Sequence, residues 1–283
     1  LPQTITYNLE TPDGTANPAA VSKTAKELPG QAKVFFMPIG SSGILGLERT
    51  KELASGLGFP GEPDFLENNI YRFRKVNPSL TLDVHFTSGA FRMYLSGGLV
   101  SIAKGSPSST TNAGAQLKSF LGKLVTTELV EGEAKFKFLK VNGGVSEVSS
   151  LSEANLVRVD LFRSDLDEAQ VYTTNPDEAP VWGIVAGGQV LETTYKYFPV
   201  EREEYSTYPI KTSQEAWQEL GEGRGGIAKL GNNPEGDIVI RRIYMGYYDS
   251  TIAAQGFMQP IYVFEGDDGF MAYVPAVTDE WIY

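Results

Sequence analysis

Short stretches of alternating apolar and polar residues, separated by glycine-rich turns, run through most of this chain and constrain its fold more than any other feature. The run LTLDVHF at residues 80–86 alternates in this way, as expected of a strand with one buried face. Asn142-Gly143, at the end of another such stretch, is the strongest hairpin signal in the sequence. We therefore expect a large share of the chain to form antiparallel sheet.

Helical patterns precede the strand-rich stretches. The first runs through ILGLERTKELASGLGF at residues 44–59 and has Gly58 as its stop, the second spans residues 113–125, and the third is SQEAWQEL at residues 213–220. In the third, Thr212 or Ser213 is placed to cap the helix and Gly221 to end it. The recurrence predicts an α+β fold made of repeated units, each with one helix on an antiparallel sheet.

A chain of 283 residues is long enough for two or three domains. Residues 1–30 are rich in Pro, Thr, Ala and Asn and lack periodicity, which predicts an extended arm or linker. A Gly/Ser/Pro/Thr-rich stretch at residues 97–111 separates the next two patterns. We expect a first α+β unit over residues 31–105, a sheet-rich middle unit over 106–200 and a C-terminal unit over 201–283.

Composition excludes several classes of chemistry. The chain has no cysteine, which removes disulfides, thiolate catalysis and Cys-ligated metal centres. Its formal net charge of -11 repels phosphate backbones, and no basic stripe stands out in the sequence, so we expect no nucleic-acid partner. We also expect no cofactor and no resident metal. No apolar stretch reaches the ~18 residues that a membrane-spanning helix needs.

The sequence has one histidine and two matches to catalytic patterns. For each of them we favour a structural role over a catalytic one. The single histidine, His85, lies mid-strand beside Asp83 and out of phase with the apolar positions. Ser101-Ile102-Ala103-Lys104 spells the S-x-x-K acylation pattern, but the companion motifs of that enzyme class are missing. The G-x-G-x-x-G run at residues 221–226 follows a helix and precedes a strand, the reverse of the dinucleotide-binding order.

Three groups of acidic residues are the remaining route to catalysis or metal binding: residues 165–168, 201–204 and 267–268. None matches the spacing of an EF-hand loop, and each falls in a predicted turn or solvated face. Turns are the favoured explanation, with adventitious calcium binding left open. A glycosidase pair of carboxylates also stays open, because it depends on separation in space.

Aromatic residues gather near the C-terminus, where Tyr side chains recur at positions 244, 247, 248, 262, 273 and 283. Most such residues in strands pack on the sheet, but an exposed tyrosine face also suits a peptide or glycan. We take the surface around Trp217, Arg241, Tyr247 and Tyr248 as the candidate partner-binding site. We identify no catalytic, cofactor-binding or metal-ligating residue.

Several C-terminal segments resemble PepSY-like regulatory ectodomains, in particular the membrane-anchored accessory regulators of the Gram-positive cell-wall sensor kinase. They are AWQELGEGRGGIAKL (216–230), IYMGYYDS (243–250) and QPIYVFEGDDGFMAYVPAVTDEWI (259–282). Residues 47–63 and 71–95 are similar to uncharacterised single-anchor surface proteins of small-genome uncultured bacteria. The resemblance implies PepSY-like units in an anchored, non-enzymatic regulator or binding module.

These observations predict a non-catalytic, extracytoplasmic binding or regulatory ectodomain that contacts a membrane or envelope protein, or a peptide. The sequence begins at Leu1 rather than Met, and we expect an N-terminal anchor or export signal before it, which would be its one link to the membrane. Two alternatives stay open. One is an envelope glycan hydrolase with paired carboxylates, and the other is a structural surface-layer component.

Overall fold

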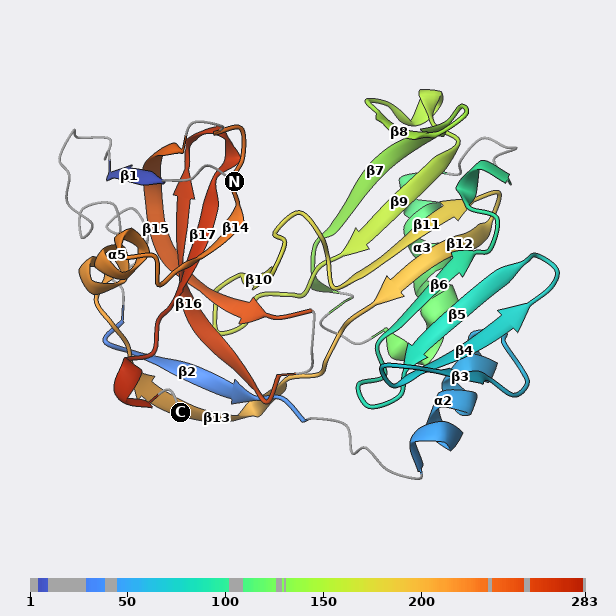
Figure 1. Ribbon diagram of the computed structural model, residues 1–283, viewed down its shortest axis with the longest axis horizontal. Coiled ribbons are helices and arrows are strands. Elements are labelled where there is room, and N and C mark those ends of the chain that lie inside the picture. The colour runs from blue at the N-terminus through green and yellow to red at the C-terminus, as the bar shows by residue number, and fades with distance from the viewer. Residues whose placement is uncertain are drawn as a thin grey trace.

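The computed structural model describes residues 5–9, 29–38, 45–101, 109–125, 129, 131–233, 236–251 and 255–281. Figure 1 shows two sheets side by side, each forming one lobe of the molecule. Among the described residues, no helix combines the length and apolarity that crossing a bilayer requires.

Nine strands form one antiparallel sheet with the order β3-β4-β5-β6-β12-β11-β9-β7-β8. They are β3 (Asp64–Leu66), β4 (Ile70–Lys75), β5 (Leu80–His85), β6 (Phe91–Leu95), β7 (Ala134–Val141), β8 (Val145–Val148), β9 (Leu156–Leu161), β11 (Val181–Ala186) and β12 (Gln189–Tyr195). Helices α2 (Leu45–Gly56) and α3 (Thr110–Leu121) pack on one face, and Figure 1 shows α3 behind β11 and β12. No helix of the described residues covers the other face.

The second sheet has eight strands and is mixed. Its members are β1 (Thr6–Leu9), β2 (Gln31–Phe36), β10 (Val171–Thr173), β13 (Glu201–Pro209), β14 (Gly226–Lys229), β15 (Asp237–Asp249), β16 (Phe257–Gly266) and β17 (Met271–Pro275). The short strands β1 and β10 run parallel to β15, whereas β16, β17 and β14 follow in antiparallel order. Helix α5 (Ser213–Gly221) packs on this sheet. Short 3₁₀ turns complete the structure: η1 (Leu99–Ser101), η2 (Gly122–Leu124), η3 (Leu151–Glu153), η4 (Asp267–Gly269) and η5 (Asp279–Trp281).

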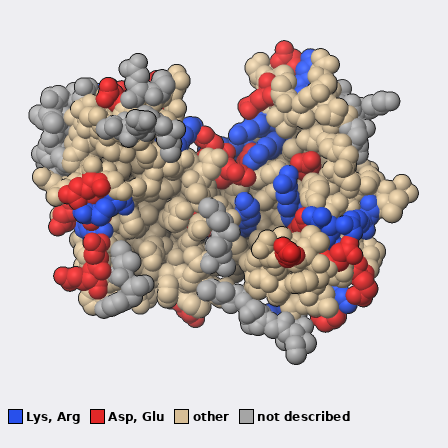
Figure 2. All heavy atoms as spheres, viewed as in Figure 1, with Lys and Arg blue, Asp and Glu red and all other residues tan. Residues whose placement is uncertain are grey.

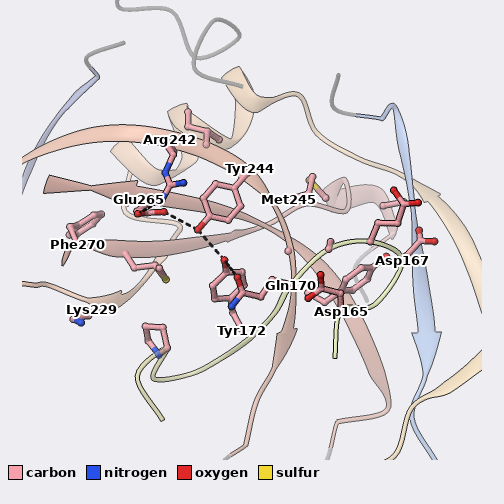
Figure 3. Close-up of a pocket in the computed structure, with 18 of the residues that line it drawn as sticks. Asp165, Asp167, Gln170, Tyr172, Lys229, Arg242, Tyr244, Met245, Glu265 and Phe270 are labelled. Atoms are coloured by element: carbon pink, nitrogen blue, oxygen red, sulfur yellow. Dashed lines mark hydrogen bonds and ion pairs between the residues drawn. The ribbon is translucent and has the colours of Figure 1, made fainter. Parts of the chain in front are cut away.

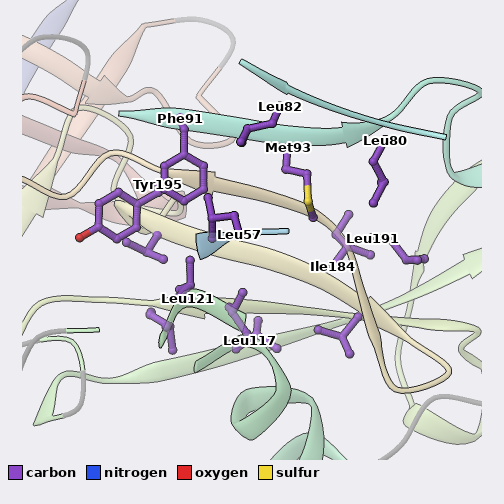
Figure 4. Packing of buried hydrophobic residues seen from close by; sticks show 14 of the residues in the cluster. Leu57, Leu80, Leu82, Phe91, Met93, Leu117, Leu121, Ile184, Leu191 and Tyr195 are labelled. Atoms are coloured by element: carbon purple, nitrogen blue, oxygen red, sulfur yellow. The ribbon is translucent and has the colours of Figure 1, made fainter. Parts of the chain in front are cut away.

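Each sheet has its own apolar core. In the nine-stranded sheet, Leu82, Met93 and Val159 are fully buried with Leu117 of α3 (Figure 4). In the eight-stranded sheet, Ala216 and Leu220 of α5 pack with apolar side chains of β15, β16 and β17. Because burying one such side chain contributes about 1.5–3 kcal/mol, these two clusters hold the helices on their sheets.

Local signals in the sequence explain several of these elements. The Asn142-Gly143 hairpin is confirmed between β7 and β8, where Gly143 has the positive φ of 69° that such a turn requires. At α5 the capping box is complete, since Thr212 and Glu215 each bond the other's backbone amide. The predicted helix over residues 44–59 is confirmed as α2.

The expectation of repeated helix-on-sheet units is wrong. Strands from distant parts of the chain pair in two large sheets instead, and α2, α3 and α5 are the three α-helices whose bounds the described residues define. The broader description holds: the fold is α+β with antiparallel sheet. Alternation in a strand shows that it has a buried face, but it does not select the strand with which it pairs, and this is why the local pattern misled.

The sheets also draw on the sequence segments that we expected to be separate units. β6, from residues 31–105, pairs with β12, from residues 106–200. Strand β2 pairs with β13 and β16 in the C-terminal segment, and Thr6–Leu9 of the expected arm pairs with β15. The chain therefore passes back and forth between the two lobes.

One buried ion pair joins the two sheets. Arg163 follows β9 of the nine-stranded sheet, and its Nε lies 2.6 Å from Oδ2 of Asp249, the last residue of β15. Their side chains are 2% and 0% exposed. The same guanidinium donates from Nη2 to the Phe198 carbonyl at 2.5 Å and lies 4.0 Å from the Tyr197 ring centroid, so it also fixes the segment that leaves β12.

The ion pair between Arg163 and Asp249 predicts that Asp249→Asn strongly destabilises the folded protein. The amide keeps the shape of the side chain but leaves the Arg163 charge buried without its counterion, so the free energy of unfolding should fall by about 3–5 kcal/mol. Urea unfolding measures it. Asp64→Asn is the matched control, because the Arg74–Asp64 pair is 59% and 58% exposed and should contribute no more than about 1 kcal/mol. Equal losses in the two variants would contradict the assignment.

Candidate functional site

A cleft of about 1100 Å³ lies against the eight-stranded sheet. One wall is β15 with the neighbouring end of β16, and the other is formed by residues 165–177, which include β10. Residues 29–32 at the start of β2 close one side, and Lys135 of β7 reaches it from the nine-stranded sheet. The site is therefore assembled from both lobes.

Polar side chains form a continuous chain of contacts across the cleft. Arg242 donates from Nη2 to Glu265 Oε1 at 2.5 Å, and the Tyr244 hydroxyl donates to Oε2 of the same carboxylate at 3.1 Å. The Tyr172 hydroxyl lies 3.0 Å from the Tyr244 hydroxyl and 2.9 Å from Gln170 Oε1. Figure 3 shows these side chains pointing toward one another. Strands β15, β16 and β10 are thus connected through their side chains.

Strand geometry places these groups together. Ile243 packs in the core with α5, so alternation turns its neighbours Arg242 and Tyr244 to the opposite face of β15. Gly246 continues that face, and a Cβ at this position would lie 2.8 Å from the Tyr172 ring. A glycine here lets β10 approach β15 closely enough for Tyr172 to reach Tyr244.

Charged residues surround the cleft, with acids in excess. Lys33 Nζ lies 2.7 Å from Asp167 Oδ1, and Lys229 Nζ lies 2.6 Å from Asp177 Oδ2. The lining carries more carboxylates than cations: Asp165, Asp167, Glu168, Asp177 and Glu265 against Lys135, Lys229 and Arg242.

The acidic loop of the cleft has a constrained backbone. Residues 166 and 169 close it as an isolated bridge, and Asp167 and Glu168 have φ angles of 50° and 64°. Arg202 holds its start by donating to Ser164 Oγ at 2.8 Å and to the Asp165 carbonyl at 3.0 Å. The loop therefore presents its side chains from a fixed turn, as predicted for this acidic group.

The cleft keeps its tyrosines protonated. Burial raises the pKa of Tyr172, Tyr244 and Tyr247 above the ordinary value, and at Tyr244 the contact with Tyr172 adds to the rise. Arg242 is held as a cation, because its hydrogen bond to Glu265 raises its pKa. The hydroxyls consequently act as hydrogen-bond donors and acceptors at every physiological pH.

The four residues predicted from the sequence do not form one site. Trp217 packs on the α5 core beside Tyr7 and Phe264. Arg241 forms an exposed bidentate ion pair with Asp267.

The two predicted tyrosines lie at the far end of β15. Tyr247 is buried and lines the cleft, and its hydroxyl donates to the Lys33 carbonyl at 3.1 Å. Tyr248 is half-buried and bonds Thr174 through its hydroxyl at 3.0 Å. Of the four predicted residues, Tyr247 is a lining residue of the cleft.

The sequence did not single out Tyr172, Gln170, Arg242 and Glu265. The enrichment of tyrosine near the C-terminus was a usable signal for Tyr244. No local signal could place Tyr172, because β10 pairs with β15, which lies more than seventy residues further along the chain.

The other sequence patterns fall outside the cleft. His85 Nδ1 lies 3.0 Å from Thr87 Oγ1 and 3.1 Å from Ser88 Oγ, within its own turn. The glycine run at residues 221–226 ends α5 and leads into β14. Residues 102–104 of the S-x-x-K pattern lie outside the described residues. Within the described ranges, no three His, Asp or Glu side chains converge as a metal ion requires.

Comparisons with known proteins add little. No protein-family model matches the chain, and no curated protein matches it. The chain is similar to the crystal structure of an uncharacterized protein from Eubacterium rectale, at 10% identity and a TM-score of 0.38 over 88% of this chain and 84% of the other. The resemblance to PepSY-like ectodomains stays a prediction.

The buried phenols predict a loss of stability in alkali. The pKa values of Tyr172 and Tyr244 are higher in the folded protein than in the unfolded chain, where a tyrosine has a pKa of about 10. Their contribution to the free energy of unfolding is therefore complete below about pH 10 and is lost as the pH rises through the folded pKa. Absorbance at 295 nm should show these tyrosines ionising together with unfolding above pH 10. Tyr244→Phe should lower the free energy of unfolding by about 1 kcal/mol at pH 7, because one hydrogen-bonding hydroxyl is removed. The variant should also lose less stability than the unchanged protein between pH 7 and pH 11.

Tyr208→Phe is the control, because this ring packs near Trp281 away from the cleft. It should leave the difference in stability between pH 7 and pH 11 as in the unchanged protein. Ionisation of every tyrosine near pH 10 while the protein is still folded would disprove the claim that the cleft keeps Tyr172 and Tyr244 protonated.

Proposed function

We propose that the chain is a non-catalytic binding module of the cell envelope, and that the cleft holds an extended basic segment of a partner protein. The observation that carries the proposal is the cleft itself, with a tyrosine floor fixed by the contacts from Arg242 to Gln170. Concave sites with aromatic walls and a few placed polar groups are typical of ligand binding.

The floor is preorganised for binding. Glu265 accepts hydrogen bonds from both Arg242 and Tyr244, and Tyr172 is held by two further contacts. Side chains that are already ordered lose little entropy when a ligand arrives, which favours affinity. Tyrosine also suits peptide recognition, because its ring packs on apolar groups while its hydroxyl bonds polar ones.

Charge selects the kind of segment. The excess of carboxylates over cations in the cleft, on a chain of net charge -11, attracts a positively charged ligand and repels an acidic one. The acidic loop at residues 165–168 is the natural contact for Lys or Arg side chains of the partner. A membrane or envelope protein remains the partner that the sequence predicts.

Ion pairing in the cleft favours binding over glycan hydrolysis. Asp167, Asp177 and Glu265 each contact a cationic side chain, at Lys33, Lys229 and Arg242 respectively. A carboxyl group that protonates a leaving oxygen needs surroundings that favour its neutral form, and a neighbouring cation does the opposite. We therefore place hydrolysis second.

Peptide binding tests the proposal. A fluorescein-labelled decapeptide of alternating Lys and Tyr should bind at least about tenfold more tightly than its Glu-Tyr counterpart, measured by fluorescence polarisation. The double variant Asp165→Asn/Glu168→Gln should lose most of this preference. The control Glu52→Gln/Glu147→Gln removes the same charge from exposed positions on α2 and β8, and should keep it. Equal binding of both peptides, or equal loss in both variants, would refute the proposal.

A further inference from the structure

One edge of β15 is only partly paired. On one side, β16 pairs with β15 from Ile240 to Tyr248. On the other side, β1 pairs with Asp237–Ile240 and β10 with Tyr247–Asp249, and both run parallel to β15. Among the described residues, no strand pairs with residues 242–246 on the side that β1 and β10 share. We call this stretch the β15 edge.

Backbone groups of Ile243 and Met245 point out from the β15 edge. The Tyr247 N–H donates to the Gln170 carbonyl at 2.9 Å, so it points toward β10 and away from β16. In an antiparallel pair, every second residue directs its N–H and C=O to the same side, which turns those of Ile243 and Met245 to the β10 side as well. Pro260, the partner of Tyr247 in β16, has no N–H and fits this alternation.

The cleft reaches the β15 edge. All six residues from Arg242 to Tyr247 line the cleft, although their side chains alternate between the two faces of the strand. A cleft that touches both faces in turn also touches the backbone between them. Figure 3 shows Tyr244 and Met245, neighbours on β15, among the side chains that line the cleft. Within the described ranges, no backbone group hydrogen-bonds to Ile243 or Met245 on this side, and buried backbone groups are rarely left without a partner.

We infer, on the basis of the proposed function, that the partner segment binds by adding a strand to the β15 edge, between β1 and β10. Main-chain hydrogen bonds to an exposed strand edge are a recurring mode of peptide recognition. Five strand residues span about 17 Å, so the edge takes about five extended residues of the partner. Proline is excluded wherever the N–H of the added strand faces β15.

The two faces of β15 select different side chains in the added strand. Tyr172 and Tyr244 lie on one face. On the other, the Tyr247 hydroxyl donates to the Lys33 carbonyl, and Lys33 pairs with Asp167, which places the acidic loop on that face. Alternate side chains of a strand share a face, so Lys or Arg at every second position meets the acidic loop while aromatic or apolar residues meet the tyrosines. The partner segment is therefore an alternating basic and aromatic strand.

Two N-methylated forms of the Lys-Tyr decapeptide test this mode of binding by fluorescence polarisation. One form carries a methyl group on every lysine amide, and the other on every tyrosine amide. The two peptides have the same charge and side chains. Only alternate N–H groups of an added strand point to its neighbour, so one form should bind at least about tenfold more weakly than the other.

Hydrogen exchange of single amides, followed by nuclear magnetic resonance, gives a second readout. The unmethylated Lys-Tyr peptide should slow exchange of the Met245 amide at least about tenfold, because the added strand supplies its acceptor. The Tyr244 amide is the matched control on the same strand. It points to β16 and should change little.

The outcomes separate this inference from the proposed function. A preference for the Lys-Tyr peptide over its Glu-Tyr counterpart, with neither the methylation effect nor protection of Met245, would overturn strand addition alone. Equal binding of the two peptides with both effects present would refute the basic partner and support strand addition. Protection of the Met245 amide in the protein without peptide would show that the edge is already paired, and would overturn the inference. Binding of neither peptide would overturn both.

Discussion

The buried contact between Arg163 and Asp249 is the constraint on which the rest of the structure depends. The chain leaves β9, contributes β10 to the other sheet and returns to β11, so the two sheets share a continuous path. At the start of that excursion, Arg163 binds the end of β15 and the carbonyl of Phe198. A charge removed from water must be fully paired, and its partners here come from both lobes.

The contact between Arg163 and Asp249 also positions the parts of the cleft. Fixing β10 against β15 brings Tyr172 to Tyr244 and sets the acidic loop at residues 165–168 beside them. In the part of the chain that the structure describes, the nine-stranded sheet has α2 and α3 on one face, and Figure 2 shows basic and acidic side chains together on the other. The chain thus presents a tyrosine-lined cleft whose lining carries more carboxylates than cations.

Local signals predicted the elements but not their partners. The Asn142-Gly143 turn, the capping box at Thr212 and the alternation at residues 80–86 act over a few residues, and the structure has each of them. The pairing of β10 with β15 and of β1 with β15 depends on contacts far apart in sequence, which periodicity does not encode.

The central claim is that two interlocked sheets fold as one unit and so present a preformed cleft. Two variants test it, each retaining one tryptophan, either Trp182 in the nine-stranded sheet or Trp217 on α5, with the others replaced by Phe. In each variant, urea unfolding followed by fluorescence should coincide with unfolding followed by far-ultraviolet circular dichroism, as a single cooperative transition requires. A tryptophan signal that changes at a different urea concentration from the circular dichroism would show that the sheets unfold separately, and would contradict the account.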